Sequence, residues 1–352
     1  MNFINYDLNK VYKIVIVATF AFAVVYFGSP LLIPLVFALF FSLLLLPVCE
    51  FIEKRTNRLI SILLTFLSVI IIIAGIGFFF GTQFYNLFEN LRHFGDNLTK
   101  VYHDFISMVD SWFANQGLEL EKILPDDNQK NIIQPTDILQ QTIASTSNFI
   151  VSLTLVFVYT FLFLLYRTSF KNFILSNVPD HRREYVAHVM VDIRKVVKDY
   201  FVGLSIIILI LGTLNGLGLW IIGLDFPFLF GFFAAILAII PYIGTFIGGL
   251  LPFIYALVNA DTLWTPVLVV AWYATVQTVE GNFLTPKIVG SRVSLNPLFA
   301  LIALLVGGYV WGIPGMILFI PILAIIKVIL DAIEPLKPLG LLLSSKFGNN
   351  SK

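Results

Sequence analysis

The sequence predicts an all-α, polytopic membrane protein with about six full spans and two further helical hairpins that are broken by glycine and proline. Of its 352 residues, 58% are hydrophobic and 12% are charged, whereas charged residues make up about 25% of an average soluble domain. Two charge-free stretches, residues 226–260 and 297–326, are too long for one membrane crossing and too short for two comfortable ones. If each is counted as crossing the membrane, the total is eight spans.

Residues 1–81 form a predicted N-terminal transmembrane segment. Residues 14–49 carry no charge and are interrupted at Gly28, Ser29 and Pro30, which predicts two helices joined by a tight turn. A third span is expected to follow at about residue 59. Basic residues flank the first pair on both sides (Lys10, Lys13, Lys54, Arg55 and Arg58). The positive-inside rule therefore places the N-terminus in the cytoplasm.

Residues 82–141 form a predicted extracytoplasmic insert, because nine acidic residues face four basic ones over residues 82–137. Apolar residues recur from Phe84 to Trp112 at helical steps, as in the seam of a coiled coil. Such a pattern fixes a face of the helix but not its partner. The 84–112 helix is therefore expected either to join subunits of a homo-oligomer or to pack against its own chain.

Residues 142–200 contain a predicted fourth span, 142–166, and a basic cytoplasmic segment. Apolar residues recur at helical spacing over residues 186–200, which predicts an amphipathic helix along the inner membrane face. A fifth span, 201–224, is expected to follow. It carries Asn215, whose amide would either line a polar pathway or bond two helices together.

Residues 201–335 form the predicted transport core, and residues 336–352 form a cytoplasmic tail. Besides the fifth span, the core contains a sixth span, 263–283, and both broken stretches. In these stretches glycine and proline occupy corresponding positions, counted from Pro227 and from Pro297. Paired interruptions of this kind are typical of an inverted repeat with a binding site near the membrane midplane.

The charge bias decides between two topologies for the first broken stretch. If it re-enters and returns outward, Asp261 stays outside, and Lys287 and Arg292 fall on the cytoplasmic side. If it crosses, these two basic residues are delivered to the outside. The sequence therefore predicts re-entry and places both termini in the cytoplasm.

The tips of the broken stretches are candidate elements of a substrate or ion pathway. Half-helix ends and unwound carbonyls at such tips can bind an ion or a polar ligand. Tight packing at a tip would also require small residues, so a structural role is equally open. The candidates are Pro241, Gly244 and Thr245 in the first stretch and Gly312, Pro314 and Gly315 in the second.

Glu280 is the most informative polar residue, because it lies near the end of a span that is otherwise free of charge. An Asp at the centre of a span costs about 2.5–3.5 kcal/mol on insertion scales, so intramembrane carboxylates usually face a partner or a cavity. Gln277 and Asn282 lie beside it in the sequence. The group is expected to bind a cation, a proton or a substrate hydroxyl, or else to pair structurally with Lys287 or Arg292.

The sequence gives little support for an enzymatic function. The four histidines fall in two pairs on predicted opposite sides of the membrane, and the single cysteine cannot build a thiolate zinc site. No nucleophile elbow or phosphate-cradling glycine loop is visible. We therefore expect no catalytic residue, cofactor or metal. The net charge of +1 argues against a nucleic-acid partner.

Three blocks of the sequence resemble the autoinducer-2 exporter (AI-2E) family of permeases. They are PYIGTFIGGLLPFIYAL (241–257), QTVEGNFLTPKIVGSRVSLNPL (277–298) and GGYVWGIPGMILFIPILAIIK (307–327). The similarity extends over nearly the whole chain. One departure is Asn296, where many members have histidine before the proline.

This resemblance implies a multi-pass transporter in the bacterial inner membrane. Some members of the family are described as exporters of the quorum-sensing signal and others as sodium or lithium/proton antiporters. The leading expectation is a permease that exports a small polar molecule similar to autoinducer-2. The alternatives are a cation/proton antiporter, which requires a titratable membrane carboxylate, and a non-transporting membrane scaffold built on the 84–112 helix.

Overall fold

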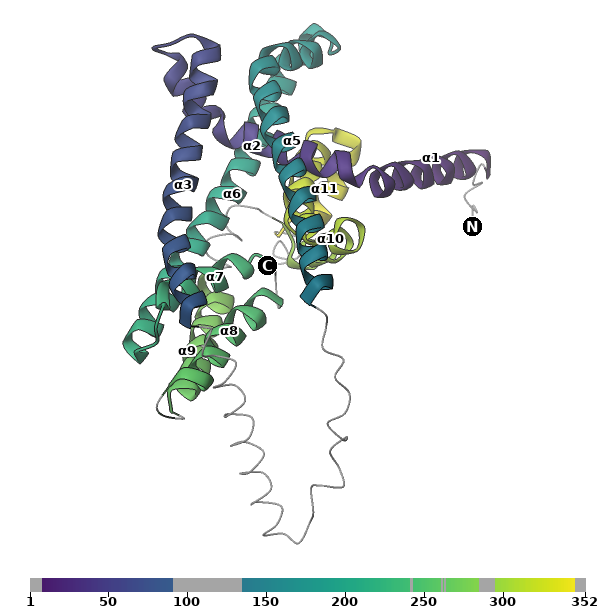
Figure 1. Ribbon diagram of the computed structural model, residues 1–352. Coiled ribbons are helices and arrows are strands. Elements are labelled where there is room, and N and C mark those ends of the chain that lie inside the picture. Colours follow the sequence, from purple (N-terminus) through teal and green to yellow (C-terminus); the bar gives the residue numbers. More distant parts are fainter. Residues whose placement is uncertain are drawn as a thin grey trace, which may run out of the picture. The chain divides into compact units, whose positions relative to one another are not determined.

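The structure, a computed structural model, is helical throughout, apart from one isolated bridge between Leu295 and Ser344. It describes residues 8–90, 135–240, 243–260, 262, 264–284 and 295–345. Over this part of the chain the prediction of an all-α, polytopic fold is confirmed (Figure 1). The elements are α1 (Leu8–Phe27), α2 (Ser29–Glu53), α3 (Arg58–Asn90), α5 (Pro135–Ser176), α6 (Asp180–Ile222), α7 (Pro227–Leu237), α8 (Ile243–Asn259), α9 (Trp264–Val279), the π-turn η2 (Glu280–Leu284), α10 (Pro297–Ala332), the 3-10 turn η4 (Glu334–Leu336) and α11 (Lys337–Leu343).

The chain forms two compact units, each assembled from separate stretches. Unit 1 comprises residues 1–68, 147–203 and 289–352, and unit 2 comprises residues 69–146 and 204–288. By length and apolar composition alone, five of the described helices could cross a membrane. They are α2, α3, α5, α6 and α10, the last of which contains a reversal at Gly312. The sequence therefore distributes its membrane-length helices over both units.

The first two helices meet at a kink rather than at the predicted tight turn. Gly28 has φ −79° and ψ 1°, and Figure 1 shows α1 and α2 continuing in nearly the same direction. Gly28 alone separates α1 from α2, and Pro30 lies in the first turn of α2, where a missing N–H costs nothing. The carbonyls at the end of α1 lack helical donors. One of them, at Val25, accepts a hydrogen bond from Trp311 Nε1 at 2.9 Å. Within unit 1 this bond ties the end of α1 to α10.

Residues 180–222 form one continuous helix, α6, where the sequence predicted a surface helix followed by a separate span. The reason is local, because no proline occurs in this range and no glycine precedes Gly203. The apolar face of residues 186–200 therefore runs directly into the membrane-length part of the helix. Val197 and Tyr200, at the end of that face, are buried in unit 1.

The first broken stretch folds as a helical hairpin in unit 2. Helix α7 begins at Pro227 and ends at Leu237, and α8 begins a few residues later. The two arms pack closely, since a Cβ added to Gly248 would lie 2.7 Å from Cα of Ala234. The far ends also meet, because the hydroxyl of Tyr255 donates to Oδ2 of Asp225 at 3.3 Å. The chain thus leaves this hairpin beside the point where it enters.

The second broken stretch, within α10, reverses at Gly312 in unit 1. This residue has φ 62° and ψ −140°, a conformation that favours glycine, and Pro314 begins the second arm just beyond it. The arms lie against each other, because the rings of Trp311 and Phe319 meet edge to face at 5.4 Å. The start of α10 is held to the end of α11, since the backbone N–H of Asn296 donates to the carbonyl of Leu343 at 2.8 Å.

Pro321 explains why Tyr200 is buried against α10. A proline has no N–H, so the carbonyl four residues before it loses its helical donor. In α10 that carbonyl belongs to Ile317, and it accepts a hydrogen bond from the hydroxyl of Tyr200 at 3.1 Å. Lipid cannot satisfy a freed backbone group, so a side chain from α6 does so.

Candidate functional site

Glu280 lies where α9 changes into the π-turn η2. Nε2 of Gln277 donates to Oε2 of Glu280 at 2.7 Å, so the structure brings these two predicted residues together. Nδ2 of Asn282 instead donates to the carbonyl of Thr278 at 2.8 Å, within the same helical segment. Lys287 and Arg292, the predicted charge partners, lie outside the described residues.

The tip of the first hairpin is closely packed in unit 2. Gly244 is buried, and a Cβ added there would lie 1.6 Å from the carbonyl oxygen of Leu237. Gly244 is therefore required so that the two arms can approach. Thr245 beside it is half-buried. Pro241, the remaining candidate at this tip, lies outside the described residues.

The tip of the second hairpin has the same local geometry in unit 1. A Cβ added to Gly315 would lie 1.9 Å from the carbonyl oxygen of Gly307. Gly315 lies 18 residues after Pro297 and Gly244 lies 17 residues after Pro227, so the two positions correspond within one residue. Gly312, by contrast, has open space around it, so its conformation alone requires glycine. Pro314 is half-buried and begins the returning arm.

Asn215 is 5% exposed and sits on α6 in unit 2. Its Oδ1 has no hydrogen-bond partner among the described residues. That atom therefore does not bond two helices together, which was one of the two roles that the sequence left open. A buried polar atom without a partner costs free energy and requires an explanation, such as a water molecule or a ligand.

Two residues that the sequence reasoning missed share this property. Nε1 of Trp272 and the hydroxyl of Tyr273, both on α9, are buried without a partner in the described part of unit 2. The indole of Trp272 packs on Gly218 of α6, one helical turn beyond Asn215. A tryptophan and a tyrosine in mid-span, each with one polar atom on an apolar ring, are the signal that could have identified them.

A cavity of about 340 Å³ in unit 2 lies at the meeting ends of the first hairpin. Oxygen-bearing groups dominate its lining, including Asp225, Tyr255, Asn259, Thr262 and Thr265. Such groups suit a hydrated cation or a molecule with several hydroxyls. The cavity therefore gives unit 2 a polar opening at the entry and exit of α7–α8.

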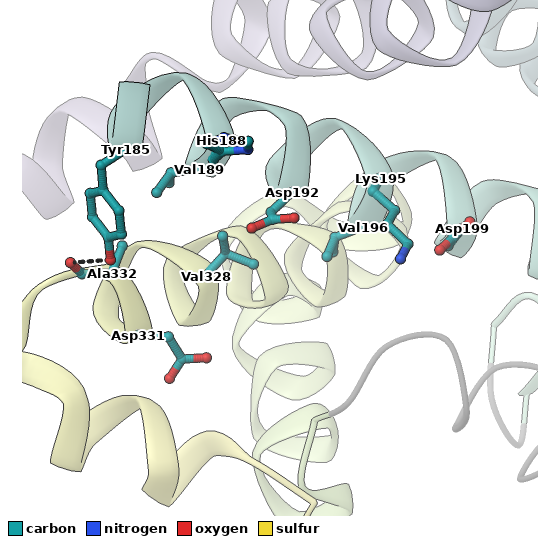
Figure 2. A pocket seen from close by; sticks show the side chains of 10 residues that line it. All are labelled: Tyr185, His188, Val189, Asp192, Lys195, Val196, Asp199, Val328, Asp331 and Ala332. Carbon is teal, nitrogen blue, oxygen red and sulfur yellow. Dashed lines mark hydrogen bonds between the residues drawn. The ribbon is translucent and has the colours of Figure 1, made fainter. Parts of the chain in front are cut away.

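A cavity of about 520 Å³ lies in unit 1 between α6 and α10. Figure 2 shows Tyr185 extending from α6 to the backbone of Ala332. The hydroxyl of Tyr185 donates a hydrogen bond to the carbonyl of Ala332 at 2.9 Å. Asp192, Asp199 and Asp331 also line it, and Asp331 is paired with Lys327 at 2.6 Å. No group of three or more His, Cys, Asp or Glu residues in the described chain is arranged to hold a metal.

Comparison with known proteins identifies one family. A family model described as "AI-2E family transporter" matches residues 14–334. Similar proteins include "Putative transport protein YrrI" of Bacillus subtilis, 28% identical over 312 residues and 85% of each chain. "Putative transport protein YueF" of the same organism is 29% identical over 86% of this chain and 84% of its own. "Putative transport protein YhhT" of Escherichia coli K12 is 23% identical over 90% and 88%. None of the three names states a substrate.

Proposed function

The chain belongs to the AI-2E family of membrane transporters, and from that premise we propose that it moves a small polar molecule along a pathway beside Glu280 in unit 2. The hairpin α7–α8 carries this proposal, because its two ends return to one polar cavity. A membrane protein that only serves as a scaffold has no use for such a hairpin. Broken helices of this kind form the binding sites of many secondary transporters.

Glu280 supplies the charge of the proposed pathway. The amide of Gln277 stabilises its carboxylate without neutralising it. The buried polar atoms of Asn215, Trp272 and Tyr273 add an acceptor and two donors to unit 2. Groups of these kinds suit a cargo with hydroxyl and carbonyl groups, such as the signalling furanone autoinducer-2, that meets them one after another.

Cation/proton antiport is the second candidate, and Glu280 is the observation that favours it. A carboxylate can bind a cation in one step and a proton in the next, which is the exchange that an antiporter requires. Glu280 is half-buried rather than enclosed, so it is accessible to an ion. The furanone and the antiport proposals therefore share one residue and differ in the cargo.

Flux measurements in proteoliposomes decide between these cargoes. Purified protein would be reconstituted, and movement of the furanone, sodium, lithium and protons would be measured separately. We expect saturable furanone flux that is absent from empty vesicles. Sodium- or lithium-driven proton movement without furanone flux would establish the antiporter instead. Absence of flux for every member of the panel would contradict both proposals.

We also propose that the chain lies in the bacterial inner membrane with both termini in the cytoplasm, and that it forms a homo-oligomer through the 84–112 helix. The positive-inside rule supports the orientation. Leu87 of this seam is buried against its own chain in unit 2, beside Leu219 and Phe230. Phe84 remains 41% exposed. Residues 91–112 lie outside the described residues.

A further inference from the structure

Unit 1 contains another cavity, of about 620 Å³, between α2, α5 and α6. Its lining has two different parts. Apolar side chains from all three helices form one part, including Leu39, Leu43, Leu46, Phe163 and Met190. Charged and polar side chains form the other, namely Glu50, Arg167, Thr168, Lys171, Asn172 and Arg194. The cavity is therefore amphipathic.

Cations outnumber anions in this lining. Arg194 forms an ion pair with Glu50 at 2.9 Å. Arg167 pairs with Glu53, which lies next to the lining, and its guanidinium also donates to Sγ of Cys49 at 3.5 Å. Lys171 has no acidic partner in the part of the chain that the structure describes. The two ion pairs hold the arginines in place, and Lys171 leaves an excess of positive charge.

The charged part of the cavity lies where three membrane-length helices change from apolar to charged sequence. Glu50 follows the apolar stretch of α2, and Arg167 and Lys171 follow that of α5. Arg194 precedes the charge-free stretch of α6, which begins at residue 200. A band of charge at the ends of apolar helices lies at the depth of the lipid headgroups.

We propose that this cavity binds an anionic phospholipid. The headgroup phosphate lies near Lys171 and Arg194, and an acyl chain follows Leu39, Leu43 and Phe163. Basic pockets between membrane helices bind anionic headgroups in this way. A free anion would gain nothing from the apolar lining, and a zwitterionic lipid would gain little from the excess of cations. An anionic amphiphile uses both parts of the cavity.

Native mass spectrometry of the purified, detergent-solubilised protein tests this proposal. Dioleoylphosphatidylglycerol and dioleoylphosphatidylcholine would be titrated in parallel. We expect tighter binding of phosphatidylglycerol and about a fivefold loss of that binding in Lys171→Gln, since one basic residue contributes about this factor near a lipid surface. Lys198→Gln is the matched control, because Lys198 is exposed on α6 outside the cavity lining, and it should bind as the wild type does.

A second variant tests the apolar part independently of charge. Ala187 lines the cavity on α6, and Ala187→Trp should fill the space and weaken binding while every cation stays in place. Equal binding of the two lipids, or equal loss in Lys171→Gln and Lys198→Gln, would overturn the proposal. Displacement of the lipid by millimolar inorganic phosphate would overturn it as well, because it would assign the cavity to a free anion.

Discussion

Replacing Gly244 by alanine is expected to destabilise the protein strongly, although it adds only one methyl group. The new Cβ would lie 1.6 Å from the carbonyl oxygen of Leu237, and the obstacle is backbone rather than a flexible side chain. Overpacking costs typically 1–3 kcal/mol, and we expect about 3 kcal/mol here because α7 and α8 must separate. The melting temperature of the detergent-solubilised protein is the measurement.

Gly75→Ala is the matched control for this substitution. Its Cβ would meet nothing within 4 Å, and alanine favours a helix over glycine by about 1 kcal/mol. The control is therefore expected to melt at the wild-type temperature or slightly above it. A Gly244→Ala protein that melts like the wild type would mean that the two arms do not approach as closely as the structure shows.

Replacing Glu280 by glutamine is expected to abolish the pH dependence of transport while leaving the protein folded. Glutamine keeps the shape of the side chain and still forms hydrogen bonds, but it carries no charge and cannot exchange a proton. Hydrogen bonds to charged groups contribute about 1.5–3 kcal/mol, so cargo affinity is expected to fall by about tenfold or more. Flux in proteoliposomes would be measured as a function of pH for the wild type and the variant.

Glu334→Gln controls for the loss of any carboxylate. Glu334 pairs with Lys337 at 2.5 Å, its side chain is 81% exposed, and it lies after the last long helix. Flux through this variant should match the wild type at every pH. If Glu280→Gln also keeps wild-type flux and pH dependence, Glu280 has only a structural role and the antiport proposal fails with it.

The hairpins were largely predictable, because glycine and proline act on the local backbone. Helices α7 and α10 begin at Pro227 and Pro297, the prolines from which the two stretches were counted, and Gly312 reverses the chain within the predicted interruption. The continuity of α6 could have been predicted too, since nothing in residues 180–202 ends a helix. The sequence left open whether the tip glycines bind a ligand or allow packing. Gly244 and Gly315 lie against backbone carbonyls, so packing accounts for both.

The polar contacts of the candidate site were less predictable, because they depend on tertiary packing. Gln277 and Glu280 lie three residues apart on one helix, and their hydrogen bond follows from that spacing. The partner of Tyr200 lies 117 residues away in the sequence. Oδ1 of Asn215 has no hydrogen-bond partner among the described residues. The residues beside Asn215 in the sequence could not predict this, because it depends on which side chains surround the amide in the fold.

Re-entry of the hairpin α7–α8 is tested by the side of the membrane to which each of its ends is exposed. Asp225 and Thr262 flank the hairpin, both are exposed, and both line the same cavity. Each would be replaced by cysteine on a Cys49→Ala background and labelled with an impermeant maleimide in right-side-out and inverted vesicles. We predict that both cysteines react from the same side, because the hairpin re-enters. Labelling of the two from opposite sides would show that the segment crosses the membrane and would contradict the account.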